Sequence, residues 1–270
     1  MNNLFLTPLE ISKTISAIGE KKASETIFEL FVFGVLAGIY IALGASVATS
    51  VLSGGTLDAG VAKFLAGSVF SVGLMLVLIL GSELFTGNIL MTIGLIYQRY
   101  SFIKVLRNWL IVYFGNLAGG LLIAWLVSKS GLLIHQGELT SIGTAAIKIA
   151  EGKMQLSFVE ALCRGILCNM LVCLAVIMSI ACKTITGKIF SIYFPIMTFV
   201  ASGYEHSVAN MYFLPAALFA KGEFLLTRFF NIFDNLVPVT IGNIIGGLLI
   251  VLLHPKVEEK IARLLLRKRQ

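Results

Sequence analysis

Long apolar stretches alternate with short polar connections along most of the chain. A helix needs roughly 20 apolar residues to cross a hydrocarbon core of about 30 Å. Six runs meet this length, at roughly 27–53, 64–97, 104–128, 156–182, 188–220 and 236–254. The pattern predicts six membrane-spanning helices, three in each half of the chain.

The second and fifth runs are too long and too interrupted to form one simple helix each. Small and polar residues break the second run between Gly81 and Asn88, and the fifth between Ala201 and Asn210. Backbone groups freed inside a membrane are costly unless they line a cavity or lie within protein. The N-terminus of a half-helix also favours an anion. We therefore interpret the two matching breaks as the lining of a pore rather than as simple kinks.

One line of sequence occurs twice. Residues 108–122 and 235–249 share eight of fifteen positions at a constant offset of 127, and a weaker echo joins 34–43 to 165–174 at an offset of 131. A repeat with an odd number of spans must insert upside down relative to its partner. The sequence thus predicts an all-α membrane protein with two inverted three-helix repeats, about 27–128 and 156–254. An N-terminal segment, 1–26, and a basic tail, 255–270, flank this channel domain, 27–254.

Composition supports a membrane protein. Hydrophobic residues make up 57% of the chain and charged residues 13%, and the mean hydropathy is +0.93; soluble domains carry about 25% charged residues. The net charge of +7 gathers beside the spans and in the tail from Lys256 to Arg269, which favours lipid headgroups over nucleic acid. Fourteen Lys and Arg residues fall on the side of the termini and six on the other, which predicts cytoplasmic termini. Four cysteines without CxxC spacing indicate neither disulfides nor a metal site, and we expect no cofactor.

His206 is the only histidine placed deep in a predicted span, and it lies in the second break beside Glu205. A lone intramembrane histidine often only makes a hydrogen bond between helices. Imidazole also titrates near neutral pH and can protonate a passing weak acid, which crosses dry protein more cheaply when neutral. The sequence leaves open whether His206 donates a proton or attracts the charge.

Several carboxylates and one cation have structural interpretations. Glu160 and Arg164 are four residues apart on one helical face, which predicts an ion pair that ties helices together. Glu83 and Glu205 occupy corresponding breaks, where we expect them to bind freed backbone N–H groups. Lys153 opens the fourth span on the outer side, where it either adds positive potential to a vestibule or is simply solvated.

Asn116 and Asn243 each lie in a Gly-Asn-x-x-Gly-Gly segment. We expect them to satisfy backbone groups of the broken helices while the glycines allow close helix packing. Asn243 also has an alternative place, facing the pore.

Taken together, these residues resemble the formate/nitrite transporter family over nearly the whole chain. The most specific segments are Glu83-Leu-Phe-Thr86, 109–117, 168–176, 199–211 and 238–247. The resemblance implies an aquaporin-like protomer of six spans, assembled as a homopentamer with one pore per subunit. It also implies a selective channel for small monovalent anions such as formate, nitrite or hydrosulfide.

By position, the resemblance places Thr86 and His206 beside a central site. It places polar residues along the anion path at Lys153, Asn169 and Asn243. It implies hydrophobic constrictions at positions that spacing alone would assign to ordinary core, Phe70, Leu74, Leu84, Phe85 and Phe199. The segment from Leu9 to Ala23 resembles one implicated in gating at acidic pH. The Phe-Thr-Gly-Asn sequence of the first break departs from some formate channels and leaves the anion undecided.

Three other functions fit the sequence less well. An aquaporin-like pore for neutral solutes lacks its Asn-Pro-Ala boxes here, and no arginine accompanies the breaks. A haem-binding redox subunit needs paired histidines on facing helices, and an intramembrane hydrolase needs a Ser/His or paired-Asp arrangement. The sequence thus predicts a transporter rather than an enzyme, with small anions, protons, lipid and further copies of itself as partners. We expect it in a prokaryotic cytoplasmic membrane.

Overall fold

The computed structural model describes residues 5–224, 226–254 and 257, and nearly all of them lie in helices. The exception in regular structure is a short hairpin, β1 (Ile134–His135) paired antiparallel with β2 (Glu138–Leu139). Five helices of the described chain are long and apolar enough to cross a membrane: Ile27–Leu52, Ala59–Leu80, Phe102–Lys129, Phe158–Ala181 and Arg228–Leu252. Shorter apolar helices, Phe85–Ile96, Ile185–Ala201 and Ser207–Ala220, complete the hydrophobic part.

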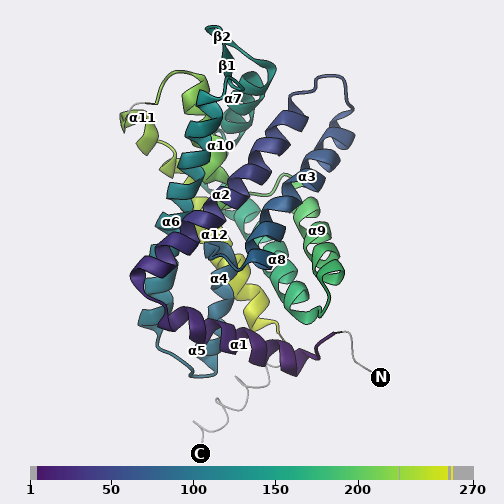
Figure 1. The fold of residues 1–270 in the computed structure, drawn as a ribbon, viewed down its shortest axis with the longest axis vertical. Coiled ribbons are helices and arrows are strands. Elements are labelled where there is room, and N and C mark those ends of the chain that lie inside the picture. The colour runs from purple at the N-terminus through teal and green to yellow at the C-terminus, as the bar shows by residue number, and fades with distance from the viewer. Residues whose placement is uncertain (1–4, 225, 255–256, 258–270) are drawn as a thin grey trace, which may run out of the picture.

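The helices follow one another along the chain in the order shown in Figure 1. They are α1 (Pro8–Ser24), α2 (Ile27–Leu52), α3 (Ala59–Leu80), α4 (Phe85–Asn88), the 3-10 turn η1 (Ile89–Met91), α5 (Thr92–Ile96), α6 (Phe102–Lys129), α7 (Ser141–Met154), α8 (Phe158–Ala181), α9 (Ile185–Ala201), α10 (Ser207–Ala220), α11 (Leu226–Phe230) and α12 (Phe233–Leu252).

Both predicted breaks exist, and each is shorter than expected. The second span stops where Gly81 adopts a left-handed backbone (φ 82°), and helix resumes at Phe85. The fifth span stops at Ala201, passes through Gly203 (φ 73°), and resumes at Ser207. Positive φ is easy for glycine because it has no Cβ. The ends of both expected breaks, 86–88 and 207–210, are therefore first helical turns rather than loop.

The two repeats use glycine in the same way to bring their outer helices together. A Cβ on Gly34 of α2 would lie 3.2 Å from the Cα of Gly115 on α6. A Cβ on Gly165 of α8 would lie 3.2 Å from the Cα of Gly242 on α12. Small residues at such crossings let helix backbones approach within the membrane. The helical fold of six spans with broken second and fifth members is confirmed.

The two ends of the molecule differ. Helix α1 lies across one end (Figure 1), and its Ile11 and Ile15 pack with Ile250 near the end of α12 and with Val257 beyond that helix. Helix α7, the hairpin and α11 lie at the opposite end. We call these the α1 end and the α7 end. The predicted helix from 9 to 23 falls within α1, whereas the basic tail lies outside the described residues apart from Val257.

Candidate functional site

The two breaks meet through one hydrogen bond between buried side chains. Thr86 Oγ1 lies 2.8 Å from His206 Nε2. Thr86 belongs to the first turn of α4, and His206 is the N-cap residue of α10. The N-terminal ends of these two half-helices therefore approach each other in the middle of the protein.

The hydrogen bonds of His206 define its tautomer. Its Nδ1 accepts from the backbone N–H of Ala209 at 3.1 Å, so this nitrogen carries no proton. The proton of the neutral ring is then on Nε2, which donates to Thr86 Oγ1. The hydroxyl proton of Thr86 is left for another acceptor.

Asn116 and Asn243 brace the two breaks with matching sets of bonds. Asn116 Oδ1 accepts from the N–H of Phe85 at 2.9 Å, and its Nδ2 donates to the carbonyls of Gly34 (2.7 Å) and Glu83 (2.9 Å). Asn243 Oδ1 accepts from Ser207 N–H at 2.9 Å. Its Nδ2 donates to the carbonyls of Gly165 (2.8 Å) and Glu205 (3.0 Å). Each amide thus ties a span of its own repeat to a break.

Glu83 anchors a buried polar network at the α1 end. Its Oε1 pairs with Lys22 Nζ at 2.7 Å, and its Oε2 accepts from Asn88 Nδ2 at 2.6 Å. Asn88 also donates to Asn108 Oδ1 (2.8 Å) and accepts from Lys22 Nζ (2.8 Å). The network joins α1, the first break and α6.

Glu205 anchors an equivalent network at the α7 end. Its Oε1 accepts from Lys153 Nζ at 2.9 Å, and its Oε2 accepts from Asn210 Nδ2 at 2.6 Å. Asn210 also donates to Asn235 Oδ1 at 2.7 Å. Lys153 lies on α7 rather than at the opening of the fourth span, and its ammonium group also lies 5.2 Å from the ring centre of Phe213.

These networks correct two expectations. Glu83 and Glu205 bind side chains, not freed backbone N–H groups, because the amides of Asn116 and Asn243 already take those donors. In the described chain no ion pair joins Glu160 to Arg164. Glu160 instead closes a capping box with Ser157, whose N–H and hydroxyl bind its carboxylate at 2.8 and 2.7 Å.

Asn169 of α8 joins Thr86 of the first break to Asn243, which braces the second break. Its Nδ2 donates to the carbonyls of Thr86 (3.2 Å) and Asn243 (2.6 Å), while its fully buried Oδ1 lacks a hydrogen-bond partner among the described residues. The thiol of Cys173, one turn further along α8, also reaches the Thr86 carbonyl at 3.7 Å. Helix α8 thus holds the backbone carbonyl of Thr86 while His206 contacts its hydroxyl.

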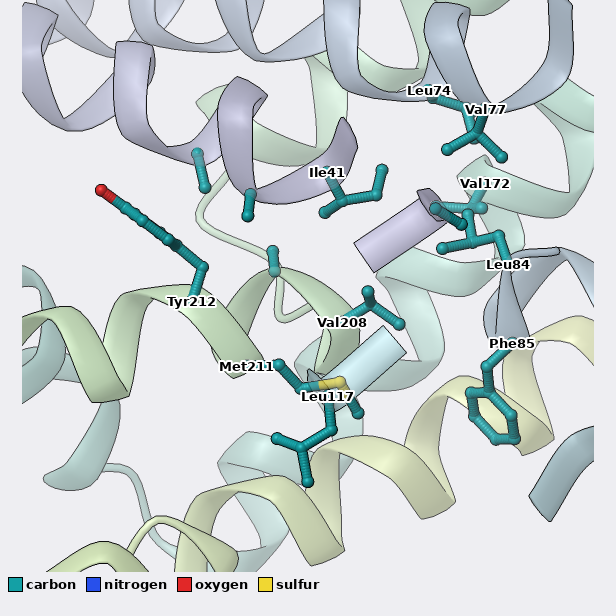
Figure 2. Close-up of a cluster of buried hydrophobic side chains, with 14 of the residues drawn as sticks. Ile41, Leu74, Val77, Leu84, Phe85, Leu117, Val172, Val208, Met211 and Tyr212 are labelled. Atoms are coloured by element: carbon teal, nitrogen blue, oxygen red, sulfur yellow. The ribbon is translucent and has the colours of Figure 1, made fainter. Parts of the chain in front are cut away.

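The expected constriction residues fall into separate groups. The rings of Phe70 and Phe199 meet edge to face at 5.6 Å, and Phe199 also lies 5.8 Å from the imidazole of His206. Figure 2 shows Leu84 and Leu74 near Val77 and Val172 in the buried apolar cluster that also contains Phe70 and Phe199. Phe85 turns away from Leu84 and packs on α6, 5.0 Å from the ring of Tyr113. Apolar groups therefore lie next to the Thr86–His206 pair, but Phe85 is not brought together with Phe199.

Comparison with known proteins now assigns the chain. The family described as "Formate/nitrite transporter" matches residues 9–256. The chain belongs to this family. It is 42% identical over 266 residues to a probable formate transporter of Methanothermobacter thermautotrophicus, covering 93% of this chain and 96% of that protein. It is 38% identical to the formate channel FocA of Escherichia coli (strain K12), covering 91% and 92%.

A solved structure shares the fold. A pentameric formate channel with formate bound superposes with a TM-score of 0.72 at 32% identity, covering 83% of this chain and 94% of that chain. Membership in a family of transporters excludes the haem-subunit and hydrolase alternatives. The chain is an integral membrane transport protein, not an enzyme.

The structure also assigns contacts that the sequence interpretation missed, above all those of Lys22, Asn88, Asn210 and the pair Asn108 and Asn235. A signal for the last pair was present, because Asn108 and Asn235 are the first residues of the duplicated line. A second signal is the equal spacing of five residues from Glu83 to Asn88 and from Glu205 to Asn210. Neither signal reveals the lysine partners, since these come from the separate helices α1 and α7.

Proposed function

We propose that this protein is a channel for small monovalent anions, with formate as the leading candidate and nitrite and hydrosulfide as alternatives. The observation that carries the proposal is the Thr86–His206 contact, which joins the two broken helices beside apolar side chains. The names of the relatives support formate: a formate transporter and a formate channel are 42% and 38% identical to the chain.

The central site suits an anion for two reasons. The N-terminal ends of α4 and α10 carry partial positive charge, which stabilises negative charge nearby. The hydroxyl proton of Thr86 is free to donate to an anion, because His206 Nε2 supplies the hydrogen bond that the hydroxyl oxygen accepts. His206 thereby polarises Thr86 rather than binding the anion by a net charge.

The same geometry bears on protonation of the cargo. In its neutral form His206 accepts at Nδ1 and donates at Nε2. A doubly protonated ring would place two donors, Nδ1–H and the Ala209 N–H, against each other. Proton transfer from His206 to a weak acid therefore requires the first turn of α10 to move, whereas hydrogen bonding through Thr86 does not.

Apolar side chains and lysines act on the anion elsewhere along the path. We expect a passing ion to lose hydration water beside the apolar side chains Phe70, Phe199 and Leu84. This loss disfavours any ion to which the central site offers no hydrogen bonds in place of the lost water. Lys22 and Lys153, each paired with a glutamate, lie near opposite mouths and add positive potential there.

Assembly and orientation complete the proposal. We place the protein in a prokaryotic cytoplasmic membrane as a homopentamer with one pore per subunit and both termini in the cytoplasm. Large exposed apolar residues on the spans, such as Phe28, Ile103 and Phe190, suit contact with lipid or neighbouring copies. The packing of α1 against the end of α12 supports termini on one side of the membrane.

Flux into proteoliposomes tests the proposal, with formate, nitrite and hydrosulfide in competition and with and without a proton gradient. We expect His206→Asn to change the pH dependence of formate flux and Thr86→Val to weaken selection among anions. His135→Asn, in the hairpin, is the matched control and should behave as the wild type. Passage of uncharged solutes at the rate of anions would instead favour an aquaporin-like pore. A formate flux in His206→Asn that matches the wild type across about pH 5 to 8 would refute the role of His206.

A further inference from the structure

A carboxyl group stands at the α1-end mouth of the pathway, at the link between α1 and α2. Glu25 is the residue that ends α1, and Thr26 begins α2. Arg107 of α6 fixes this link, because its Nη2 donates to the carbonyls of Ala23 (3.0 Å) and Glu25 (2.8 Å). The backbone of the link at Glu25 is thereby held by α6.

Glu25 lines a cavity of about 330 Å³ that also reaches Leu84. The charged residues of the lining come from α1 and its C-cap, the first break and α9: Lys21, Lys22, Glu25, Glu83 and Lys188. Three lysines and two glutamates leave one positive charge in excess when both carboxyls are ionised. They leave two when Glu25 is neutral. The cavity therefore offers a route between Leu84 and the α1 end that an anion can take.

The two glutamates of the cavity differ in their contacts. Both carboxylate oxygens of Glu83 have hydrogen-bonding or ionic partners. Oε2 of Glu25 is buried and has no hydrogen-bond partner among the described residues. Burial raises the pKa of Glu25, as do the nearby carboxylates of Glu83 and Glu29, against the opposing effect of Lys22 and Lys21. The remaining charged neighbours, Arg107 and Lys188, approach from α6 and α9.

The α7 end has no matching carboxyl. The offset of 131 between the repeats pairs Lys22 with Lys153 and Thr26 with Ser157. The same offset pairs Glu25 with Leu156. The buried lysine and glutamate pair is thus common to both mouths, and the additional acid is found at one of them.

We propose that Glu25 is a proton-controlled charge that sets the anion conductance of the α1-end mouth: when ionised it reduces the positive excess of the cavity and lowers the local anion concentration, and when protonated it raises both. This inference rests on the proposed function, since it requires an anionic cargo. In the proposed orientation the α1 end faces the cytoplasm. Acidification of the cytoplasm would therefore raise the anion conductance of this mouth. One unit charge acting over about 4 Å of water changes a local anion concentration about five-fold, and salt reduces this.

Membrane vesicles of both orientations test the proposal, with uptake of labelled formate as the readout and the internal pH held constant. In inside-out vesicles the α1 end faces the medium. There the flux of Glu25→Gln should be about three- to five-fold that of the wild type at an external pH of about 8, and this ratio should fall toward one as the external pH is lowered to about 5. In right-side-out vesicles this ratio should not depend on external pH. High salt, which shortens the screening length to about 3 Å at 1 M, should bring the ratio toward one.

Two further variants are matched to this test. Glu25→Leu copies the residue of the α7 end and should behave like Glu25→Gln. Glu20→Gln removes an exposed carboxylate of α1 that does not line the cavity, and it should keep the wild-type profile. A flux ratio that does not vary with pH at the α1 end overturns the proposal, as does an equal effect of Glu20→Gln.

A measurement independent of transport separates this inference from the proposed function. Infrared difference spectra of the purified wild type should show a protonated carboxyl that disappears in Glu25→Gln but not in Glu20→Gln. The absence of this band would refute the claim that Glu25 takes up a proton. A wild type that takes up no formate, nitrite or hydrosulfide refutes the channel and the control of flux together, while the infrared band still decides whether Glu25 holds the proton.

Discussion

Replacement of Asn243 by alanine should destabilise the fold strongly, because one buried side chain serves three backbone groups. Its amide binds the N–H of Ser207 and the carbonyls of Gly165 and Glu205, at 2.8 to 3.0 Å. Leaving one buried group unpaired costs about 1–3 kcal/mol, so three cost about 3–9 kcal/mol. Hydrogen bonds within membranes average only about 0.6 kcal/mol, which sets a floor near 2 kcal/mol. Even this floor is a large part of a total stability of about 5–15 kcal/mol.

The assay is reversible unfolding in mixed micelles, followed by the fluorescence of Trp109 and Trp125 as dodecyl sulfate is added. Asn116→Ala should lose a similar amount, because Asn116 makes the same three kinds of bond in the other repeat. Thr144→Ala removes a single exposed hydrogen bond on α7 and should stay within about 0.5 kcal/mol of wild type. A loss for Asn243→Ala no larger than that of Thr144→Ala would refute the bracing role.

Two further outcomes follow from the networks and the helix crossings. Glu83→Gln should cost about 1.5–3 kcal/mol in the same unfolding assay, because it leaves the partly buried Lys22 ammonium without its counter-ion. Glu151→Gln breaks an exposed pair with Lys221 and should cost under about 1 kcal/mol; equal losses would contradict this. Gly165→Leu should abolish the monodisperse peak in gel filtration, because its Cβ would lie 2.8 Å from the backbone oxygen of Val239, whereas Gly152→Leu has open space and should elute as wild type.

The sequence was sufficient for the spans and their breaks because both depend on local chemistry. Apolar length determines which segments can cross a membrane, and clusters of glycine and polar residues mark where helix is interrupted. Gly81 illustrates this, since it ends α3 with a left-handed backbone. The extent of each break was overestimated because Thr86 and Asn88 are polar but still helical. Their side chains find partners in other elements, which no local pattern reports.

Pairings between distant elements were the part that the sequence could not supply. The spacing of Glu160 and Arg164 fits an ion pair, but Ser157 three residues earlier gives a competing capping box, and that local bond wins. Lys153 looked like the start of the fourth span because the segment before it carries mixed polarity. It is part of α7, a separate helix at the α7 end of the molecule, and only the fold brings it to Glu205.

The spacing of the two networks also explains how a symmetric scaffold produces an asymmetric site. Glu83 and Asn88 correspond to Glu205 and Asn210, so Leu84 corresponds to His206 and Thr86 to Val208. Each repeat therefore contributes one polar and one apolar side chain to the junction, and the polar ones meet across it. The scaffold must be duplicated, since both breaks need the same backbone support. The junction must differ between the repeats, because two histidines or two leucines could not form the donor chain from imidazole to hydroxyl to anion. Exchange of Thr86 and Val208 alone would leave His206 without its acceptor, although every bracing asparagine would remain in place.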